Sequence, residues 1–130
     1  MARSRGLSKE ELVKRALETR FHTSFLRDRK AQTIRTLGGE HSFDLVSSKV
    51  RIIGEVKSTQ YPAAEKSLPT KVGDVSRDII LLLGVKRAKR RILVLTDKKF
   101  FDFFINTRQA RIANSLGVKT ILVDSRRQCS

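Results

Sequence analysis

Two segments rich in β-branched residues, 42–47 and 50–58, lie only two residues apart, and this spacing constrains the fold more than any other feature. Apolar and polar residues alternate in both segments, which is typical of strands whose two faces meet different surroundings. The short separation, Ser48-Lys49, predicts a β-hairpin. Because Ser-Lys is not a favoured hairpin turn, we expect the hydrophobic pattern, and not the turn, to set the register.

The register that this pattern favours pairs Leu45 with Ile52 and Asp44 with Ile53. One face of the hairpin then carries the apolar residues of the core, namely Phe43, Leu45, Ile52 and Val56. Asp44 lies on the other face, diagonal to Glu55, at about 7–8 Å by backbone, which lets the two carboxylates share an ion. A shift by one residue would drive Asp44 into the core, which is costly.

The rest of the chain predicts helices alternating with strands. Helices are expected at 9–20, at 70–83 and from 96 or 97 to 114 or 115, strands at 91–95 and 119–123, weaker strands at 24–26 and 33–37, and a loop at 61–69. Ser8 and Glu11 form a capping box at the first helix, and Gly84 and Gly117 end the other two. The order α, β-hairpin, α, β, α, β indicates an α/β fold with a mixed sheet flanked by helices.

The length and composition point to one domain over residues 1–130, with basic tails at 1–7 and 124–130. A single cysteine excludes a disulfide framework, and one cysteine with two histidines excludes a zinc finger. The longest uncharged apolar run, 79–85, is far shorter than a membrane span, and the start of the chain lacks the apolar region of a secretory signal. We therefore expect a cytoplasmic protein, nucleoid-associated if prokaryotic, with no membrane and no small-molecule cofactor.

The charge of the chain indicates a polyanionic partner. Twenty-eight Lys and Arg against thirteen Asp and Glu give a formal net charge of +15. Nucleic acid is the commonest such partner, because neutralising its phosphates releases condensed counterions. The alternative is an ordinary solvated surface. The residues expected to contact nucleic acid are Arg27, Arg29, Lys30, Ser58, Lys71, Arg77, Lys86, Arg87, Lys89 and Arg90.

Two carboxylates and a lysine on one strand face suit a hard divalent cation next to phosphate. Mg²⁺ prefers oxygen ligands and keeps several waters, so Asp44 and Glu55 could suffice as carboxylate ligands, and we expect Mn²⁺ to substitute. Such an ion polarises a phosphoryl oxygen and lowers the pKa of a bound water. Lys57 could then orient or help deprotonate that water, or stabilise developing charge. The alternative is an exposed strand face with ordinary solvated charges.

Phe43-Asp44-Leu45-Val46 followed by Gly54-Glu55-Val56-Lys57 resembles the core signature of the PD-(D/E)XK nuclease superfamily, which includes many restriction endonucleases and the archaeal Holliday junction resolvases. Residues 8–59 resemble the resolvases most. The resemblance implies a restriction-endonuclease-like mixed sheet of order α-β-β-β-α-β. It also implies that Asp44 and Glu55 bind metal and that Lys57 is the catalytic lysine. Phe43 replaces the name-giving proline, and a helix and strand after Lys57 have no counterpart in the resolvases.

The superfamily often adds a glutamate from the first helix. Of the candidates, Glu10 lies at the border of the helix's buried face, whereas Glu11 and Glu18 lie on the far side, and Glu40 is a further candidate outside the helix. Glu10 is therefore the expected third acid, against the alternative that it only favours the helix dipole. The backbone carbonyl of Val56 is the expected main-chain ligand.

Together these features predict a Mg²⁺-dependent endodeoxyribonuclease that hydrolyses phosphodiester bonds, either structure-selective like a junction resolvase or of restriction type. A homodimer is expected, because two strands need two cuts; the phenylalanines at 100, 101, 103 and 104 could supply an interface or fill the core. Two alternatives remain: a non-catalytic basic nucleic-acid-binding protein with a structural acidic triad, and an RNA-directed factor. The residues leave the substrate shape, duplex or branched, open.

Overall fold

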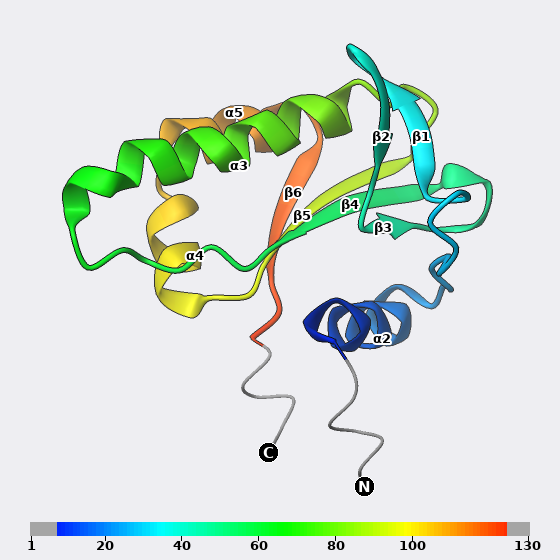
Figure 1. Cartoon of the computed structure of the whole chain (residues 1–130), viewed down its shortest axis with the longest axis horizontal. Coiled ribbons are helices and arrows are strands. Elements are labelled where there is room, and N and C mark those ends of the chain that lie inside the picture. Colours follow the sequence, from blue (N-terminus) through cyan, green and yellow to red (C-terminus); the bar gives the residue numbers. More distant parts are fainter. Residues whose placement is uncertain (1–7, 125–130) are drawn as a thin grey trace, which may run out of the picture.

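The computed structural model describes residues 8–124, so the basic tails expected at 1–7 and 124–130 lie outside the described residues except for Asp124. Figure 1 shows the helices and strands along the chain. They are α2 (Lys9–Phe21), β1 (Thr33–Thr36), β2 (Gly39–Ser42), β3 (Leu45–Val46), the 3-10 turn η1 (Ser48–Val50), β4 (Ile52–Lys57), the 3-10 turn η2 (Glu65–Ser67), α3 (Leu68–Leu83), β5 (Arg90–Leu95), α4 (Lys98–Phe104), α5 (Arg108–Ser115) and β6 (Val118–Leu122).

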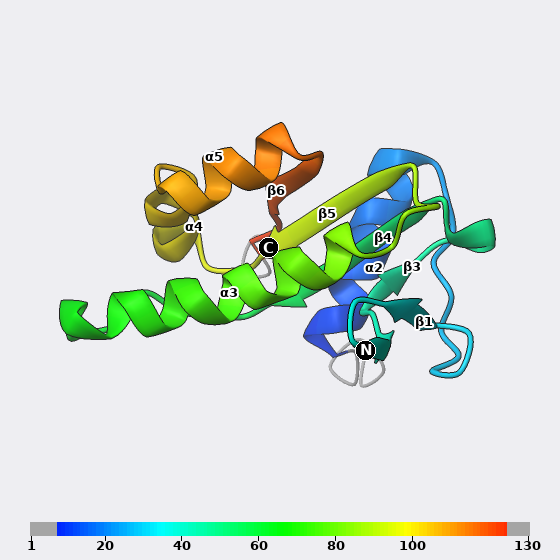
Figure 2. The ribbon, with the colours of Figure 1, turned by 90° about the horizontal axis from the view of Figure 1, so that it is seen from above.

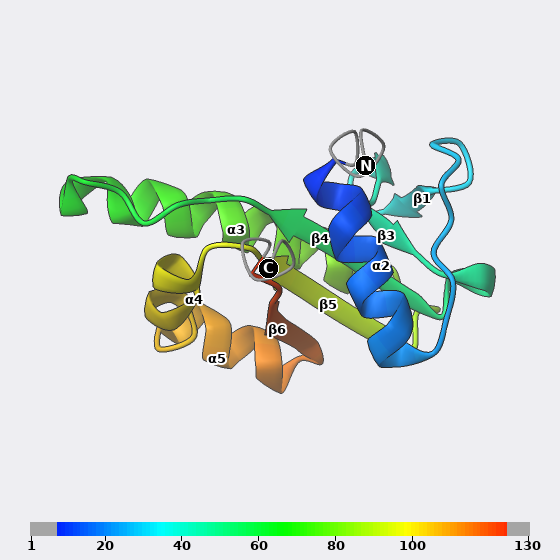
Figure 3. The ribbon, with the colours of Figure 1, turned by 90° about the horizontal axis from the view of Figure 1, so that it is seen from below.

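The main sheet has the order β3-β4-β5-β6, and helices cover both of its faces. β3 runs antiparallel to β4, whereas β4, β5 and β6 are parallel, so the sheet is mixed. α3 and α5 lie over one face (Figure 2), and α2 crosses the other (Figure 3). The coarse expectation of an α/β fold with a helix-covered mixed sheet is confirmed.

Covering both faces explains the sequence of β4, since a strand buried on both sides is apolar almost throughout. Ile52 packs with α2 in one hydrophobic cluster, and Ile53 packs with α3 in the other. Glu55 is the one charged residue of β4 that is buried. A carboxyl group in such a position needs a specific reason to be there.

The expected register of the hairpin is wrong by two residues. Leu45 lies opposite Gly54 and Val46 opposite Ile53, and residues 47–51 form the connection. Lys49 and Val50 have φ of 60° and 55° inside η1, and the Ile52 amide donates to Ser47 Oγ at 2.8 Å. Ser-Lys does not form a two-residue turn, so a longer loop replaces it.

A shift by two residues keeps Leu45 and Asp44 on their expected faces, because side chains alternate with a period of two. The shift does change the cross-strand partners. Extended by one residue beyond Leu45 and Gly54, the register places Asp44 opposite Glu55. Phe43 is an exception to the expected grouping. The chain bends at Asp44, and Phe43 packs in the cluster that contains Ile53, away from Leu45.

The segment before β3 forms a second hairpin that the pattern did not predict in full. The strand expected at 33–37 exists as β1, and it pairs with β2 in a separate two-stranded sheet. The expected strand 42–47 is therefore reduced to β3. The weak strand at 24–26 is a single bridge between Phe25 and Ser47.

The prediction of one long helix after β5 is wrong, because this segment forms two helices, α4 and α5. Thr107 caps α5 by accepting a hydrogen bond from the Ala110 amide, and a Thr in this position favours a new helix start. Phe100 and Phe104 are fully buried, so these two rings fill the core rather than an interface.

Other helix boundaries follow the expectations closely. Ser8 Oγ accepts from the Glu11 amide at the start of α2. α3 begins at Leu68 instead of Thr70, inside the expected loop, because a proline such as Pro69 is tolerated in a first helical turn. Gly84 ends α3 as expected. Within residues 8–124, no helix combines the length and apolarity needed to cross a bilayer.

Replacing Gly54 should destabilise the sheet, because β4 and β5 approach closely there. A Cβ on this residue would lie 2.6 Å from Ile92 Cγ1 and 2.8 Å from the Ile92 carbonyl oxygen. We expect Gly54→Ala to lower the free energy of unfolding by about 1–3 kcal/mol in urea denaturation. Gly73→Ala is the control: its Cβ meets nothing within 4 Å in α3, so it should stabilise the fold by about 0.5–1 kcal/mol. Equal stability of the two variants would contradict this packing.

Candidate functional site

Asp44 and Glu55 meet where β3 begins beside β4. Asp44 Oδ2 accepts a hydrogen bond of 2.8 Å from the Val56 amide, which holds the carboxylate against β4. The N–H and C=O of a strand residue point to the same side, so the Val56 carbonyl faces the edge that Asp44 occupies. The structure thus brings together the two carboxylates and the backbone carbonyl that the sequence singled out.

Glu55 is buried and incompletely satisfied. Its exposed fraction is 5%, and its Oε1 lies 2.9 Å from His41 Nε2 of β2. Within the described part of the chain, Glu55 Oε2 is buried without a hydrogen-bond partner. Burial raises the pKa of Glu55 to about 9, and the negative charges of Asp44 and Asp78 add to the rise. Without a compensating positive charge, this carboxyl group therefore holds a proton at neutral pH.

Lys57 lies on the same face of β4 as Glu55, two residues along the strand. Its Nζ forms an ion pair of 3.0 Å with Asp78 Oδ2 of α3, and the Asp78 side chain is itself largely buried. The helix that covers this face therefore holds the lysine head group in place. The three residues expected at one strand face, Asp44, Glu55 and Lys57, lie on that face together.

Sequence reasoning missed two members of this site. Asp78 had a signal, because it falls between Val75 and Leu82 on the apolar stripe of α3, where a charged residue is out of pattern. His41 had no such signal: it sits in β2, whose role depends on the unpredicted hairpin. Its ring also packs edge-on against Phe43, with the centroids 4.6 Å apart.

The donor set fits a hard cation. Two carboxylates and one carbonyl supply only oxygen, and the orphaned Glu55 Oε2 gains a partner if a cation is present. Across residues 8–124 there is no group of three or more His, Cys, Asp or Glu side chains placed to hold one ion. An ion here would depend on the pair, the Val56 carbonyl and its own waters, which suits Mg²⁺ better than a metal that needs a full protein cage.

Glu10 does not join this pair through any hydrogen bond or ion pair within residues 8–124. It lies in the first turn of α2, which packs on the sheet face opposite Glu55, and it pairs with Lys14 at 3.7 Å. Lys14 is buried and donates to the Leu26 carbonyl at 2.9 Å. The catalytic role of Glu10 stays a prediction.

The residues expected to contact nucleic acid divide into two groups. Arg27 is engaged internally: it pairs with Glu18 and, at 2.7 Å, with Glu11, and these hydrogen bonds raise its pKa. Its charge is compensated, so it is a poor phosphate ligand in this conformation. Lys71 is half-buried, and the remaining residues are exposed: Arg29, Lys30, Ser58, Arg77, Lys86, Arg87, Lys89 and Arg90.

No protein-family model, no curated protein and no solved structure matches this chain. A function must therefore be argued from the residues and their geometry.

The raised pKa of Glu55 predicts a pH-dependent stability. Between its ordinary value of 4.5 and about 9, the folded chain keeps a proton that the unfolded chain has lost, so the contribution of Glu55 to stability falls as pH rises through this range. We expect Glu55→Gln, which is never charged, to be more stable than the wild type by about 3–5 kcal/mol near pH 8 in EDTA. The difference should shrink toward about pH 5.

Chemical denaturation across this pH range measures the effect. The control is Glu40→Gln, which changes an exposed carboxylate of the neighbouring β2 strand and should leave the profile unaltered. A Glu55→Gln profile parallel to that of the wild type would show that Glu55 ionises in the folded chain as freely as in the unfolded one.

Proposed function

We propose that the chain is a metal-dependent endodeoxyribonuclease that hydrolyses phosphodiester bonds. The observation that carries the proposal is the buried, half-satisfied Glu55 beside Asp44, with Lys57 on the same strand face. A carboxylate pair repels phosphate. In a chain whose net charge of +15 attracts phosphate, such a pair can lie next to phosphate if a cation bridges the carboxylates and the phosphate. Mg²⁺, or Mn²⁺ in its place, is the cation that this oxygen donor set favours.

Asp44, Glu55 and the Val56 carbonyl are the groups that would hold the metal. When bound, such an ion polarises a phosphoryl oxygen and supplies a water of lowered pKa. The ion would also compensate the charge of Glu55, so burial of this side chain would no longer favour the protonated form. The predicted third carboxylate, from Glu10, is not needed if the ion keeps several waters.

The surrounding side chains position this machinery. The Lys57 ammonium group can donate to a phosphate oxygen or to the attacking water, and its ion pair with Asp78 limits the rotamers from which it does so. His41 binds Glu55 Oε1 and so leaves Oε2 as the free ligand atom. We assign His41 and Asp78 as positioning residues, each acting through the carboxylate or amine that it contacts.

The order of elements supports a restriction-endonuclease-like fold within this proposal. A helix, α2, precedes the strands up to β4, which are followed by α3 and the parallel strand β5. This agrees with the α-β-β-β-α-β order of the superfamily that the sequence resembles, if β1 and β2 are counted as one hairpin before β3. The segment α4-α5-β6 is the additional part.

Loss of the Glu55 carboxylate should abolish cleavage without loss of binding. We expect Glu55→Gln to cleave DNA about a hundredfold or more slowly than the wild type with Mg²⁺ or Mn²⁺. Its affinity for the same DNA in EDTA should be unchanged, because the basic surface is intact. The assay compares linear duplex, flapped and four-way DNA with duplex RNA, and Glu40→Gln serves as the matched control.

Metal-dependent cleavage by Glu55→Gln at the wild-type rate would overturn the assignment. Absence of cleavage by the wild type on every substrate, with binding retained, would leave the non-catalytic binding protein as the function. Cleavage of RNA alone would favour an RNA-directed enzyme. The dimer stays a prediction. Cleavage of both strands of a duplex or junction in this assay would favour it, because these substrates need two cuts.

Metal binding should also be visible without catalysis. We expect Mn²⁺ to raise the melting temperature of the wild type, since a ligand at a hundredfold excess over its Kd stabilises a fold by about 2.7 kcal/mol. Asp44→Asn should lose most of this increase. Lys57→Ala should keep it while losing cleavage by about a hundredfold, because the lysine is proposed to act on water or phosphate and not on the metal. Equal increases for the wild type and Asp44→Asn would exclude this pair as the metal site.

A further inference from the structure

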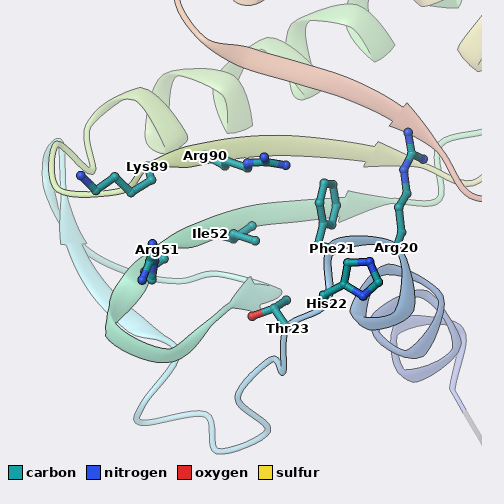
Figure 4. Close-up of a pocket in the computed structure, with 8 residues that line it drawn as sticks. All are labelled: Arg20, Phe21, His22, Thr23, Arg51, Ile52, Lys89 and Arg90. Carbon is teal, nitrogen blue, oxygen red and sulfur yellow. The ribbon is translucent and has the colours of Figure 1, made fainter.

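A pocket of about 470 Å³ lies at the end of the sheet where β4 and β5 begin. Three separate segments build it: the end of α2, the junction between η1 and β4, and the start of β5 (Figure 4). Its polar side chains are almost all basic, and an aromatic ring lies among them. The residues that matter here are Arg20, Phe21, His22, Arg51, Lys89 and Arg90.

The positive charge of this pocket is uncompensated. No Asp or Glu lines it, and within residues 8–124 none of its four Lys and Arg takes part in an ion pair. Other cations of the chain do have acidic partners, as Arg27 has Glu11 and Glu18, and Lys98 has Asp102. Crowding like charges costs stability through repulsion. A ligand that neutralises them would remove this cost.

The pocket is also ordered before any ligand binds. The amides of Lys89 and Arg90 both donate to the Arg51 carbonyl, at 2.8 and 3.0 Å, and this fixes the backbone that carries all three side chains. The Arg20 and Arg90 guanidinium groups lie 5.8 and 5.4 Å from the centre of the Phe21 ring. Cation–π contact of this kind holds planar guanidinium groups in place. Arginine forks held in this way suit the paired oxygens of phosphate.

The basic surface continues past this pocket. A second hollow of about 310 Å³ shares Phe21, Lys89 and Arg90 with the first, and extends to the exposed Lys119 of β6. Each hollow has more room than one phosphate group needs, and the two adjoin through the three residues that they share. A chain of successive phosphates fits such a surface better than a single small anion does.

This surface is separate from the carboxylate pair. Ile52, which lines the pocket, packs on the α2 face of the sheet, whereas Glu55 lies on the opposite face, three residues or about 10 Å along the strand. A phosphate in the pocket is therefore not the one next to Glu55.

We infer that this pocket binds backbone phosphates of nucleic acid at a place distinct from the cleavage site. The inference rests on the proposed function in taking nucleic acid as the ligand. Its consequence is that part of the binding energy comes from nucleotides remote from the bond that is cut. Arg51 and Arg90 are the central phosphate ligands, with Lys89 and Arg20 beside them.

The test measures binding of fluorescent duplex DNA in EDTA as a function of salt. We expect Arg51→Ala/Arg90→Ala to bind about tenfold or more weakly than the wild type, because two charge-assisted hydrogen bonds are lost. The slope of log affinity against log salt should fall by about two, one for each lost phosphate contact. A second variant, Arg51→Ala/Lys89→Ala, preserves the contact of Arg90 with Phe21 and should weaken binding similarly, and thermal melts check that both variants fold.

Arg108→Ala/Arg111→Ala is the matched control, because it removes two exposed arginines of α5 that line neither hollow. If this control loses as much affinity as the folded pocket variants do, the loss reflects overall charge and not the pocket, and the inference is overturned. A nucleoside triphosphate provides a second arm. Suppose that the triphosphate binds the wild type but not the pocket variants, while these variants bind DNA with the same affinity as the control. The pocket then serves a free nucleotide, and the inference fails.

The same variants separate this inference from the nuclease proposal. When cleavage with Mn²⁺ is measured over a range of DNA concentrations, the pocket variants should keep kcat and raise KM, whereas Glu55→Gln loses kcat and keeps its affinity. If the wild type never cleaves but the pocket variants still bind DNA weakly, the nuclease proposal fails and the pocket stands. If the wild type cleaves DNA but the pocket variants bind it with unchanged affinity, the pocket inference fails and the nuclease proposal stands.

Discussion

The pairing of Leu45 with Gly54 is the contact on which the geometry of this molecule depends. It sets the two-residue strand β3 against β4, and through that pairing it places Asp44 beside Glu55 and beneath the Val56 amide. The absence of a side chain at Gly54 lets β5 approach from the other side of β4. Gly54 thus lies between two neighbouring strands at the point where the register brings Asp44 and Glu55 together.

Glu55 places a carboxyl group in a strand that is covered on both faces, and contacts from other elements hold the groups around it. His41 approaches Glu55 from β2, and Asp78 of α3 holds Lys57. Each contact comes from a different element, so the site draws together the second hairpin, the sheet and a covering helix. Within residues 8–124, Glu55 Oε2 is still left without a hydrogen-bond partner, which is uncommon for a buried polar atom.

The sequence predicted the faces of the strands better than their partners. Alternation assigned Asp44, Glu55 and Lys57 to one face correctly, because a shift of register by two residues leaves every face unchanged. The register itself depended on the connection after Ser47, where positive φ at Lys49 and Val50 could not be read from residue types that normally avoid it. The division of α4 from α5 was missed because the capping preference of Thr107 competed with a continuous helical pattern. His41 could not have been found without the β1-β2 hairpin.

The short strand β3 has a further consequence for how separate molecules meet. The Leu26 amide donates to the Val46 carbonyl at 2.8 Å, and Phe25 bridges to Ser47, so the outer side of β3 is already paired within the chain. The opposite margin of the sheet is β6, which exposes Lys119. An unpaired strand margin invites intermolecular sheet growth, and a lysine there opposes it by electrostatic repulsion. Within residues 8–124, sheet growth between molecules is therefore opposed by hydrogen bonds at one margin and by charge at the other.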